Sequence, residues 1–437
     1  MRSRKRMGIA AAAMAALGLS VATATNASAS GNPPSLAGQT INVAIAYPAP
    51  KADLAQFTKQ TGIKVNWNYV QWDSLQTKIA AAAQAHSYFA DVADVDWSKV
   101  GEYYATKWFM PLNKYFPLAS VRSQYPQAPA FIRNGQLLGM PMDASLLVTT
   151  VNTKIFKAAG IKKYPTTLAQ YEANLKTIAA KTSVKHPLDI PFAAAEGLST
   201  YWYEMTAAFG GDVLSSSYKP LFTSPSSPGY KAMSWMINAY KTGLVPKANL
   251  NMVDYQALET DMAHGLVASV FSDYAGDLGT IYNVPSQSKV VGQVRYIPTP
   301  GATGIGPNVG NPDGMGIPVE AKHVAAAVAF MKWMEQPAIQ AAFAGAKGAK
   351  YVMPTFPLPS NRGGLAIWAK SGKVPGAATL ESLIEHHAKP IFPAGAPPWY
   401  SQFSNAVYTN IHQAAAGSES VAAAIKAIAA QVKSLGG

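Results

Sequence analysis

The sequence predicts an α/β fold built on an open sheet, and residues 57–97 contain the observations that predict it. Residues 63–69 alternate between apolar and polar side chains, with β-branched and aromatic residues on one face, as is typical of a strand. Gly62 stands where a left-handed residue ends a helix, and the Ala-rich run 74–85 favours a second helix. A short apolar run, 91–95, then predicts a buried strand. The order helix, strand, helix, strand is the repeat of an open α/β sheet, which binds ligands beyond the carboxyl ends of its strands.

Similar patterns extend along the rest of the chain. Strands are predicted at 40–46, 146–151, 265–271 and 291–297, where β-branched or alternating residues gather. Helices are predicted at 97–111, 152–160, 167–180, 229–242, 321–335 and 421–433. Residues 298–316 are rich in Gly, Pro and Asn and predict a long loop that is either functional or a crossover of the chain.

Composition indicates a globular protein with more than one core. The chain has 437 residues, which is too long for one ordinary core and predicts two lobes. Its formal net charge is +13, and removal of residues 1–29, which hold four basic and no acidic side chains, leaves +9. The Lys residues are scattered singly, without a basic run that is interleaved with aromatics. We therefore expect no nucleic-acid partner.

The N-terminus predicts export. Residues 1–7 are positively charged, residues 8–24 are Ala-rich, and Ala27-Ser28-Ala29 fits a cleavage site before Ser30. An uncleaved membrane anchor is the alternative, but the segment is only weakly hydrophobic, and no later stretch is apolar enough to span a bilayer. We expect residues 1–29 to be a signal peptide and the protein to reach the periplasm or the extracellular space. The chain has no cysteine, so neither a disulfide nor a lipid anchor on cysteine is expected.

The order of six motifs resembles the family 1 extracellular solute-binding proteins of ABC importers, the group of sugar-binding proteins that includes maltose-binding protein. The motifs lie at residues 57–65, 71–79, 91–96, 135–141, 152–161 and 314–318, and an Ala-rich helix with Trp333 follows the last one. The resemblance covers nearly the whole chain after residue 29. One departure is Ala275, which stands where the family commonly has a Trp, with Tyr274 beside it.

The resemblance implies a two-lobe fold of the periplasmic-binding-protein type (type II), in which three hinge crossovers join two α/β lobes. Carried over to this chain, the crossovers fall near residues 142–145, 308–313 and 351–355. Lobe 1 would then comprise residues 38–142 and 314–352, and lobe 2 residues 143–313 and 353–437. Pro and Gly flank all three crossovers, as suits segments that absorb a backbone rotation.

Candidate ligand-binding residues are aromatic and acidic side chains at the ends of predicted elements, because a sugar needs flat aromatic faces and planar hydrogen-bonding groups. A structural role is the alternative for each of them, a cap in the case of Asp143 and packing within a lobe for Trp97, and of the neighbouring Tyr201, Trp202 and Tyr203 we expect one to line the cleft. Trp72 is interpreted as packing on the helix that it precedes, and Asn311 and Asp313 as turn formers. The predicted ligand-binding residues are Tyr47, Asp96, Trp97, Asp143, Tyr201, Trp202, Asp273, Tyr274 and Trp399.

Trp399 is predicted from its local setting. Pro397 and Pro398 fix the backbone just before a predicted helix, 401–416, and set Trp399 at its first turn. The segment resembles the one that carries a sugar-stacking aromatic in maltose-binding protein.

The sequence contains no motif that indicates catalysis, a metal or a cofactor. His386 and His387 follow Glu385, but neighbouring residues on a helix point about 100° apart, so a solvated helix face is expected. A G-x-S-x-G elbow, a phosphate loop and an H-E-x-x-H motif are all absent from the sequence. We expect no enzyme, no catalytic residue, no metal site and no cofactor.

The predicted function is capture of a carbohydrate between the two lobes, by a monomer that delivers it to the permease subunits of an ABC importer. One alternative is the same role for a non-sugar solute such as a glycerol phosphodiester, which would need an Arg in the cleft; Arg122, Arg133, Arg295 and Arg362 are available. Another alternative is a secreted glycosidase, which would need two carboxylates at a set spacing. The sequence gives no such pair.

Overall fold

The first sheet is assembled from the N-terminal part of the chain and one later strand. The computed structural model describes residues 35–253, 255–346 and 358–437, so the predicted signal peptide and the predicted crossover at 351–355 lie outside the described residues. The strand order is β2-β1-β3-β12-β6, with β1 parallel to β2 and β3, and β12 antiparallel to β3 and β6. These strands are β1 (Thr40–Ile45), β2 (Lys64–Tyr69), β3 (Val92–Asp96), β6 (Met140–Pro141) and β12 (Asp313–Gly316).

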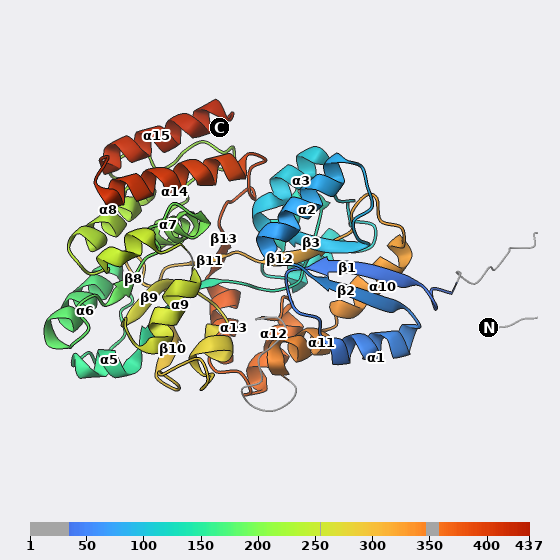
Figure 1. The fold of residues 1–437 in the computed structure, drawn as a ribbon, viewed down its shortest axis with the longest axis horizontal. Coiled ribbons are helices and arrows are strands. Elements are labelled where there is room, and N and C mark those ends of the chain that lie inside the picture. Colours follow the sequence, from blue (N-terminus) through green and yellow to red (C-terminus); the bar gives the residue numbers. More distant parts are fainter. Residues whose placement is uncertain (1–34, 254, 347–357) are drawn as a thin grey trace, which may run out of the picture. The chain divides into compact units, whose positions relative to one another are not determined.

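Helices α1 and α2 connect the parallel strands as the sequence predicts. Gly62 ends α1 in the left-handed conformation, with φ 72°, and its N–H donates to the Thr58 carbonyl oxygen at 2.8 Å. All five residues of β3 are buried, as expected for a strand covered on both faces. Helix α10 returns from late in the chain to the same core, where Phe330 and Trp333 contact Phe57 at ring-centroid distances of 5.3 and 5.2 Å. Blue α1 and orange α10 therefore lie in the same half of Figure 1. The helices of this half include α1 (Lys51–Thr61), α2 (Trp72–Gln84), α3 (Val100–Thr106), α4 (Leu118–Gln124) and α10 (Val324–Met334).

A glycine-rich strand, β12, lies in the middle of this sheet, within the segment that the sequence predicts to be a loop. A Cβ on Gly314 would come within 2.8 Å of the Phe131 ring, and one on Gly316 within 2.6 Å of Phe109 and Val95. Glycine weakens a strand on its own, so the ladders to β3 and β6 on both sides hold this segment extended. The local sequence pattern misses the strand because its stability comes from tertiary contacts.

The second sheet has the strand order β10-β7-β9-β8. Strand β7 is antiparallel to both β10 and β9, whereas β8 is parallel to β9. The C-terminal helices α14 and α15, red in Figure 1, pack with the green middle of the chain around this sheet. The elements are β7 (Leu147–Asn152), β8 (Leu188–Asp189), β9 (Ser269–Tyr274), β10 (Val294–Ile297), α5 (Thr153–Ala158), α6 (Leu168–Lys181), α7 (Glu196–Ala208), α8 (Pro228–Lys241), α9 (Tyr255–His264), α13 (Ala377–His386), α14 (Tyr400–Ala416) and α15 (Val421–Ser434).

Helix α7 runs through the core of this half. Every residue from 198 to 208 is buried, the polar ones included, so the helix is enclosed on all sides. Tyr201 donates to the Asp189 carbonyl oxygen at 3.2 Å, and the Trp202 Nε1–H donates to the Gly229 carbonyl oxygen at 2.9 Å. Tyr203 stacks on Phe403 of α14. The three neighbouring aromatics are therefore core residues, fixed by hydrogen bonds or ring stacking.

Two connections among the described residues join the two halves of the fold. One runs from β6 to β7, and the other from β11 to β12. They lie side by side, because Asn311 N–H donates to the Ser145 carbonyl oxygen at 3.1 Å and Met142 N–H donates to the Asp313 carbonyl oxygen at 2.8 Å. Smaller elements complete the fold: β4 (Ile132–Arg133), β5 (Gln136–Leu137), β11 (Asn308–Gly310), β13 (Ala388–Pro390), α11 (Pro337–Ala341) and α12 (Arg362–Lys370).

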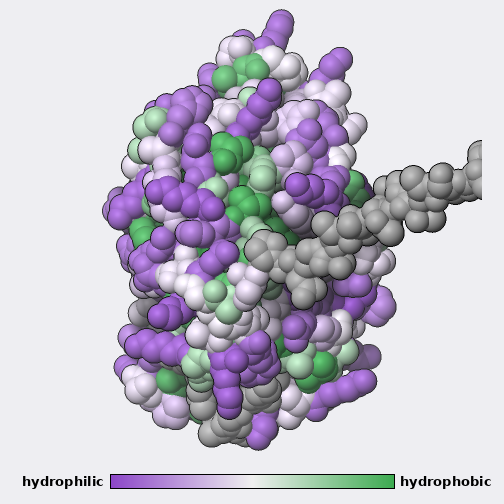
Figure 2. Space-filling model, turned by 90° about the vertical axis from the view of Figure 1, so that its right-hand side faces the viewer, coloured by the Kyte–Doolittle hydropathy of each residue, from purple (hydrophilic) through white to green (hydrophobic). Residues whose placement is uncertain are grey.

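Most other predicted elements agree with the structure within a few residues. Thr167 caps α6 by accepting from Gln170 N–H, and Ser420 caps α15 by accepting from Ala423 N–H. The predicted helix 97–111 ends earlier, at Thr106. Among the described residues, none of the helices combines the length and the apolar character that crossing a membrane requires. The face shown in Figure 2 is mainly hydrophilic, with hydrophobic residues in small groups.

Candidate ligand-binding site

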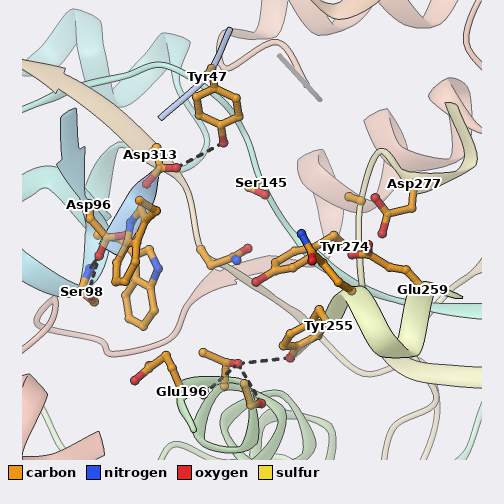
Figure 3. A pocket seen from close by; sticks show the side chains of 17 residues that line it. Tyr47, Asp96, Ser98, Ser145, Glu196, Tyr255, Glu259, Tyr274, Asp277 and Asp313 are labelled. Carbon is orange, nitrogen blue, oxygen red and sulfur yellow. Dashed lines mark hydrogen bonds between the residues drawn. The ribbon is translucent and has the colours of Figure 1, made fainter. Parts of the chain in front are cut away.

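A pocket of about 580 Å³ opens where strand ends of both sheets meet the first turns of two helices. This volume is in the range of small-molecule sites. The strands β1, β2, β3 and β9 contribute at or just after their carboxyl ends, and α7 and α9 contribute at their N-termini (Figure 3). The lining residues are Tyr47, Trp72, Asp96, Trp97, Ser98, Ser145, Glu196, Gly197, Thr200, Tyr255, Gln256, Glu259, Tyr274, Ala275, Asp277, Asn311 and Asp313.

Asp96, the last residue of β3, organises one side of the pocket. Its carboxylate caps the following turn by accepting from Ser98 N–H at 2.7 Å and from the Ser98 hydroxyl. Its other oxygen accepts from Trp72 Nε1–H at 3.0 Å, which holds the indole ring in place at the pocket. Trp97 is only 8% exposed and packs on Tyr400, with ring centroids 5.3 Å apart.

Tyr47 is held at the pocket by two carboxyl groups, one from the connection between β6 and β7 and one from the first residue of β12. Its hydroxyl lies 2.9 Å from Asp143 Oδ2 and 3.2 Å from Asp313 Oδ2. Asp143 also accepts from Asp313 N–H at 2.9 Å, so the two connections and Tyr47 form one network. Burial raises the pKa of Asp143 to about 6, against the hydrogen bonds, which lower it. Burial also raises the pKa of Asp313, and neighbouring carboxylates add to the effect.

The opposite side of the pocket carries an aromatic pair and further acids. Tyr274, at the end of β9, and Tyr255, at the start of α9, have ring centroids 4.6 Å apart. The Tyr255 hydroxyl is within 3.2 Å of the Thr200 hydroxyl and 3.0 Å of the Ser272 hydroxyl. Glu259 and Asp277 lie beside Tyr274 (Figure 3). This side therefore presents aromatic faces next to carboxylates.

Asp273 supports this side of the pocket from within the core. It is fully buried, and one carboxylate oxygen accepts from Thr150 at 2.6 Å and from Tyr282 at 2.8 Å. Burial raises its pKa to about 6. Burial, followed by the charges of Glu259 and Asp273, raises the pKa of Asp277 well above its usual value.

Glu196 is placed by helix α14. It is the first residue of α7, and its carboxylate accepts from the Tyr400 hydroxyl and from the Ser404 hydroxyl, the latter at 2.6 Å. Burial raises the pKa of Glu196 to about 7, although both hydrogen bonds lower it.

The structure brings together four of the nine predicted ligand-binding residues. Tyr47, Asp96, Trp97 and Tyr274 line the pocket. Asp143 and Asp273 are fully buried and do not line the pocket. Each accepts a hydrogen bond from a residue that does: Asp143 from the Tyr47 hydroxyl and Asp273 from Tyr274 N–H.

The remaining three predicted residues lie away from the pocket lining. Tyr201 and Trp202 are wholly buried on α7, because that helix is enclosed on all sides. Trp399 immediately precedes α14, where its ring packs against Tyr218 and Phe403 at 5.8 and 6.0 Å. Of the residues weighed as structural, Trp72, Asn311 and Asp313 do line the pocket.

Sequence reasoning missed the residues at the helix starts. Glu196, Tyr255 and Glu259 belong to the first turns of α7 and α9, which meet the strand ends across the pocket. The signal that could have found them is the position of a predicted helix start, because helix N-termini in such sheets lie at the ligand edge. Which residue of a first turn faces the pocket depends on helix rotation, which only the fold fixes.

One group of carboxylates, two at the pocket lining and one buried behind them, has a spacing that suits a cation. Single carboxylate oxygens of Glu259, Asp273 and Asp277 all lie within 4.8 Å of one another. Oxygen ligands at this spacing suit a hard cation or an ammonium group. Hydrogen bonds already occupy much of Asp273, so Glu259 and Asp277 are the accessible members.

Comparison with known proteins defines the class of the molecule. A family model described as "Bacterial extracellular solute-binding protein" matches residues 40–341. The chain belongs to the family of bacterial extracellular solute-binding proteins. No curated protein sequence matches the chain significantly.

Solved structures share the fold at low sequence identity. A solute-binding protein of an ABC transporter from Agrobacterium radiobacter K84, in complex with ribitol, has a TM-score of 0.76 at 19% identity, over 92% of this chain and 99% of that chain. Maltose-bound MalE3 of T. maritima has a TM-score of 0.74 at 18% identity, over 91% and 99%. The sugar-binding protein MalE of Xanthomonas citri has a TM-score of 0.73 at 17% identity, over 91% and 97%. The predicted family and the predicted two-lobe α/β fold are confirmed.

Proposed function

We propose that the protein captures a mono- or oligosaccharide in the pocket and delivers it to the membrane permease of an ABC importer. The observation that carries the proposal is the lining itself. Aromatic side chains of Tyr47, Trp72, Tyr255 and Tyr274 line the pocket together with carboxylates, at strand ends and helix starts. Aromatic rings suit the C–H faces of a sugar, and carboxylates accept from its hydroxyls. Similar proteins bind ribitol and maltose, which agrees with a polyhydroxy ligand.

The two-sided lining favours a clamp that closes on its ligand. We infer lobe boundaries at residues 38–142 and 314–352 for lobe 1, and 143–313 and 353–437 for lobe 2. The two antiparallel connections near Asp143 and Asp313 would then act as hinges, because backbone rotation there changes the distance between the pocket walls. Residues 1–29 would direct export, and the mature chain, a monomer without a cysteine anchor, would act in the periplasm or outside the cell.

Other ligand classes and activities receive less support. A glycerol phosphodiester would want an Arg in the pocket, and none of the described lining residues is an Arg. Arg122 and Arg133 instead line a separate pocket of about 330 Å³, and Arg362 pairs with Glu385. Hydrolysis of a glycoside requires an acid and a second carboxylate placed around the scissile bond, and a binding protein of this family needs neither. We therefore propose no enzymatic activity and no nucleic-acid partner.

A ligand screen tests the proposal. The mature chain is melted in the presence of neutral sugars, sugar alcohols, amino sugars and glycerol phosphodiesters, because a ligand that binds only the folded state raises the melting temperature by mass action. We expect at least one saccharide or sugar alcohol to raise it, and calorimetry then gives the affinity. Stabilisation by phosphodiesters alone would contradict the proposal. Release of new reducing ends from an oligosaccharide would indicate an enzyme instead.

A further inference from the structure

The charge of the pocket is opposite to that of the chain. Among the seventeen described lining residues there are five acids and no Lys, Arg or His. The whole chain has a net charge of +13 and only 23 acidic residues, so more than a fifth of its acids gather around one pocket. Lys99 does not line the pocket, although its charge lowers the pKa of Asp96 and Glu196. A ligand that enters this site therefore meets acidic side chains, and no basic one, on both sides. The acidic lining residues are Asp96, Glu196, Glu259, Asp277 and Asp313.

One group of acids at the pocket is formed by Glu259, Asp273 and Asp277, of which single carboxylate oxygens lie within 4.8 Å of one another. Asp277 is 7% exposed, and its Oδ2 accepts no hydrogen bond from the described residues. Its other oxygen is 3.4 Å from the Thr280 hydroxyl, which is a weak contact. A buried carboxylate oxygen without a donor is unfavourable, so a ligand that brings a donor to this side chain would relieve the penalty.

The aromatic wall beside these acids favours an organic cation over a metal ion. Tyr274 and Tyr255 lie 4.6 Å apart and line the pocket next to Glu259 and Asp277 (Figure 3). A ring face attracts an ammonium group. A calcium ion would take six to eight oxygen ligands, but Asp273 already accepts from Thr150, Tyr282 and a backbone N–H.

We propose that the ligand is a saccharide that carries a protonated amine, and that its ammonium group binds between Glu259 and Asp277 against the ring of Tyr274. The sugar rings then contact Trp72 and Tyr47 on the other side. This inference rests on the proposed function and narrows its substrate class to amino-substituted sugars. It also gives a reason for the acidic lining, since an ammonium group favours the ionised form of nearby carboxyl groups, whereas a neutral sugar needs only hydrogen-bond acceptors.

Matched ligands test the inference. Calorimetry on the mature chain compares pairs that differ in one substituent: glucose with glucosamine, galactose with galactosamine, and cellobiose with the free-amine and N-acetylated disaccharides of glucosamine. We expect the free-amine member of the pair that binds best to bind on the order of tenfold more tightly than its neutral partners at low salt, as one new ion pair would give. The advantage should shrink in 0.5 M NaCl, because salt screens charges that are partly open to solvent.

Variants locate the effect. Asp277→Asn and Glu259→Gln keep the side-chain size and should each remove most of the preference for the amine. Glu320→Gln removes an acid outside the pocket lining and should retain it. Melting of each variant checks that it folds; Asp277→Asn removes a buried charge and should not destabilise the protein. If the amine preference is unchanged in both pocket variants, the inference is overturned.

The remaining outcomes separate this inference from the function on which it rests. Binding of neutral sugars without a preference for the amine overturns the inference and leaves the proposed function intact. Binding of CaCl2 alone, lost in Asp277→Asn and unaccompanied by an amine preference, overturns it in favour of a metal site. If no saccharide of any kind binds, the proposed function fails as well.

Discussion

Trp97 packs its ring edge-to-face on Tyr400, with ring centroids 5.3 Å apart, and this contact joins the first sheet to the core of the second. Trp97 directly follows β3, whereas Tyr400 is the first residue of α14. Two residues further along, Lys99 Nζ donates to the Ser401 hydroxyl at 2.6 Å. The contact lies beside the pocket, because Trp97 lines it, so approach of the two halves and enclosure of a ligand are linked.

Gly101→Ala should hinder the approach of the two halves of the protein toward each other. A Cβ at Gly101 would lie 2.2 Å from the Ala396 carbonyl oxygen and 2.7 Å from the Pro397 carbonyl carbon, and backbone atoms cannot move aside cheaply. We expect a loss of ligand affinity of tenfold or more, and a larger radius of gyration in small-angle scattering with saturating ligand. In an exposed helix, Gly→Ala would instead stabilise by about 0.5–1 kcal/mol. A variant with raised stability and unchanged affinity would contradict this prediction.

Trp72→Ala should reduce ligand binding with little effect on the melting temperature of the free protein. The indole lines the pocket, and its loss removes an aromatic face from the sugar, at a cost of about 1–3 kcal/mol in binding free energy. Trp72→Phe serves as the matched control, because it keeps a ring but loses the hydrogen bond to Asp96. If the Trp72→Phe variant retains its affinity for the ligand and the Trp72→Ala variant loses it, the effect is due to ring stacking. Calorimetric titration that gives equal affinities for wild type and Trp72→Ala would contradict the prediction.

Trp399→Ala should have the opposite profile. The sequence predicts that Trp399 contacts the ligand, but its ring packs on Tyr218 and Phe403 and does not line the pocket. We therefore expect a decrease in the free energy of unfolding of about 1–3 kcal/mol, less than for a fully buried Trp, with nearly unchanged affinity. Denaturant titration and calorimetry measure the two quantities. A large loss of affinity at unchanged stability would restore the sequence-based prediction for Trp399.

Stability should fall as the pH rises from 5 to 8. Burial raises the pKa of Asp143 to about 6, that of Glu196 to about 7 and that of Glu335 to about 8. The folded chain therefore binds these protons more tightly than the unfolded chain, in which Asp and Glu titrate near pH 4. Their contribution to stability is complete below about pH 4 and is lost as the pH rises through 6 to 8. We expect a lower melting temperature at pH 8 than at pH 5.

Glu335→Gln provides the control for this pH dependence. Glu335 lies outside the pocket, and its Oε1 is buried without a hydrogen-bond partner among the described residues. The neutral side chain cannot lose a proton, so the decrease in melting temperature between pH 5 and 8 should be smaller than in the wild type. An identical pH profile would show that Glu335 does not contribute.

Export predicts a processed N-terminus. If residues 1–29 are a signal peptide, protein collected from outside the cytoplasm should begin at or near Ser30. Mass spectrometry of the exported chain measures this directly. An exported chain that retains Met1 would contradict the prediction.

The parts of the fold that the sequence predicts well are those stabilised by local pattern. The alternation in β2 and the left-handed Gly62 both agree with the structure. Strand β12 is not predicted, because its glycines are required by steric contact with the rings of Phe131 and Phe109, which lie far away in sequence. Local pattern carries no trace of such a contact.

The candidate site divides in the same way. Tyr47, Asp96, Trp97 and Tyr274 are predicted because strand ends are readable from the sequence, and all four line the pocket. Glu196 and Glu259 are not predicted, because the direction in which residues near a helix start point depends on how the helix packs. Tyr201 and Trp202 have the right chemistry for sugar contact, but α7 is buried on every side.

The hydrogen bond between Lys99 and Ser401 joins the two walls in a chain that has no cysteine. A single cysteine placed at the exposed Ser401 would be the only thiol in the molecule, so one environment-sensitive dye could be attached there without further engineering. Its emission would follow the separation of Lys99 and residue 401 as ligand enters. The protein could thereby be converted into an optical sensor for its own solute, read directly in solution.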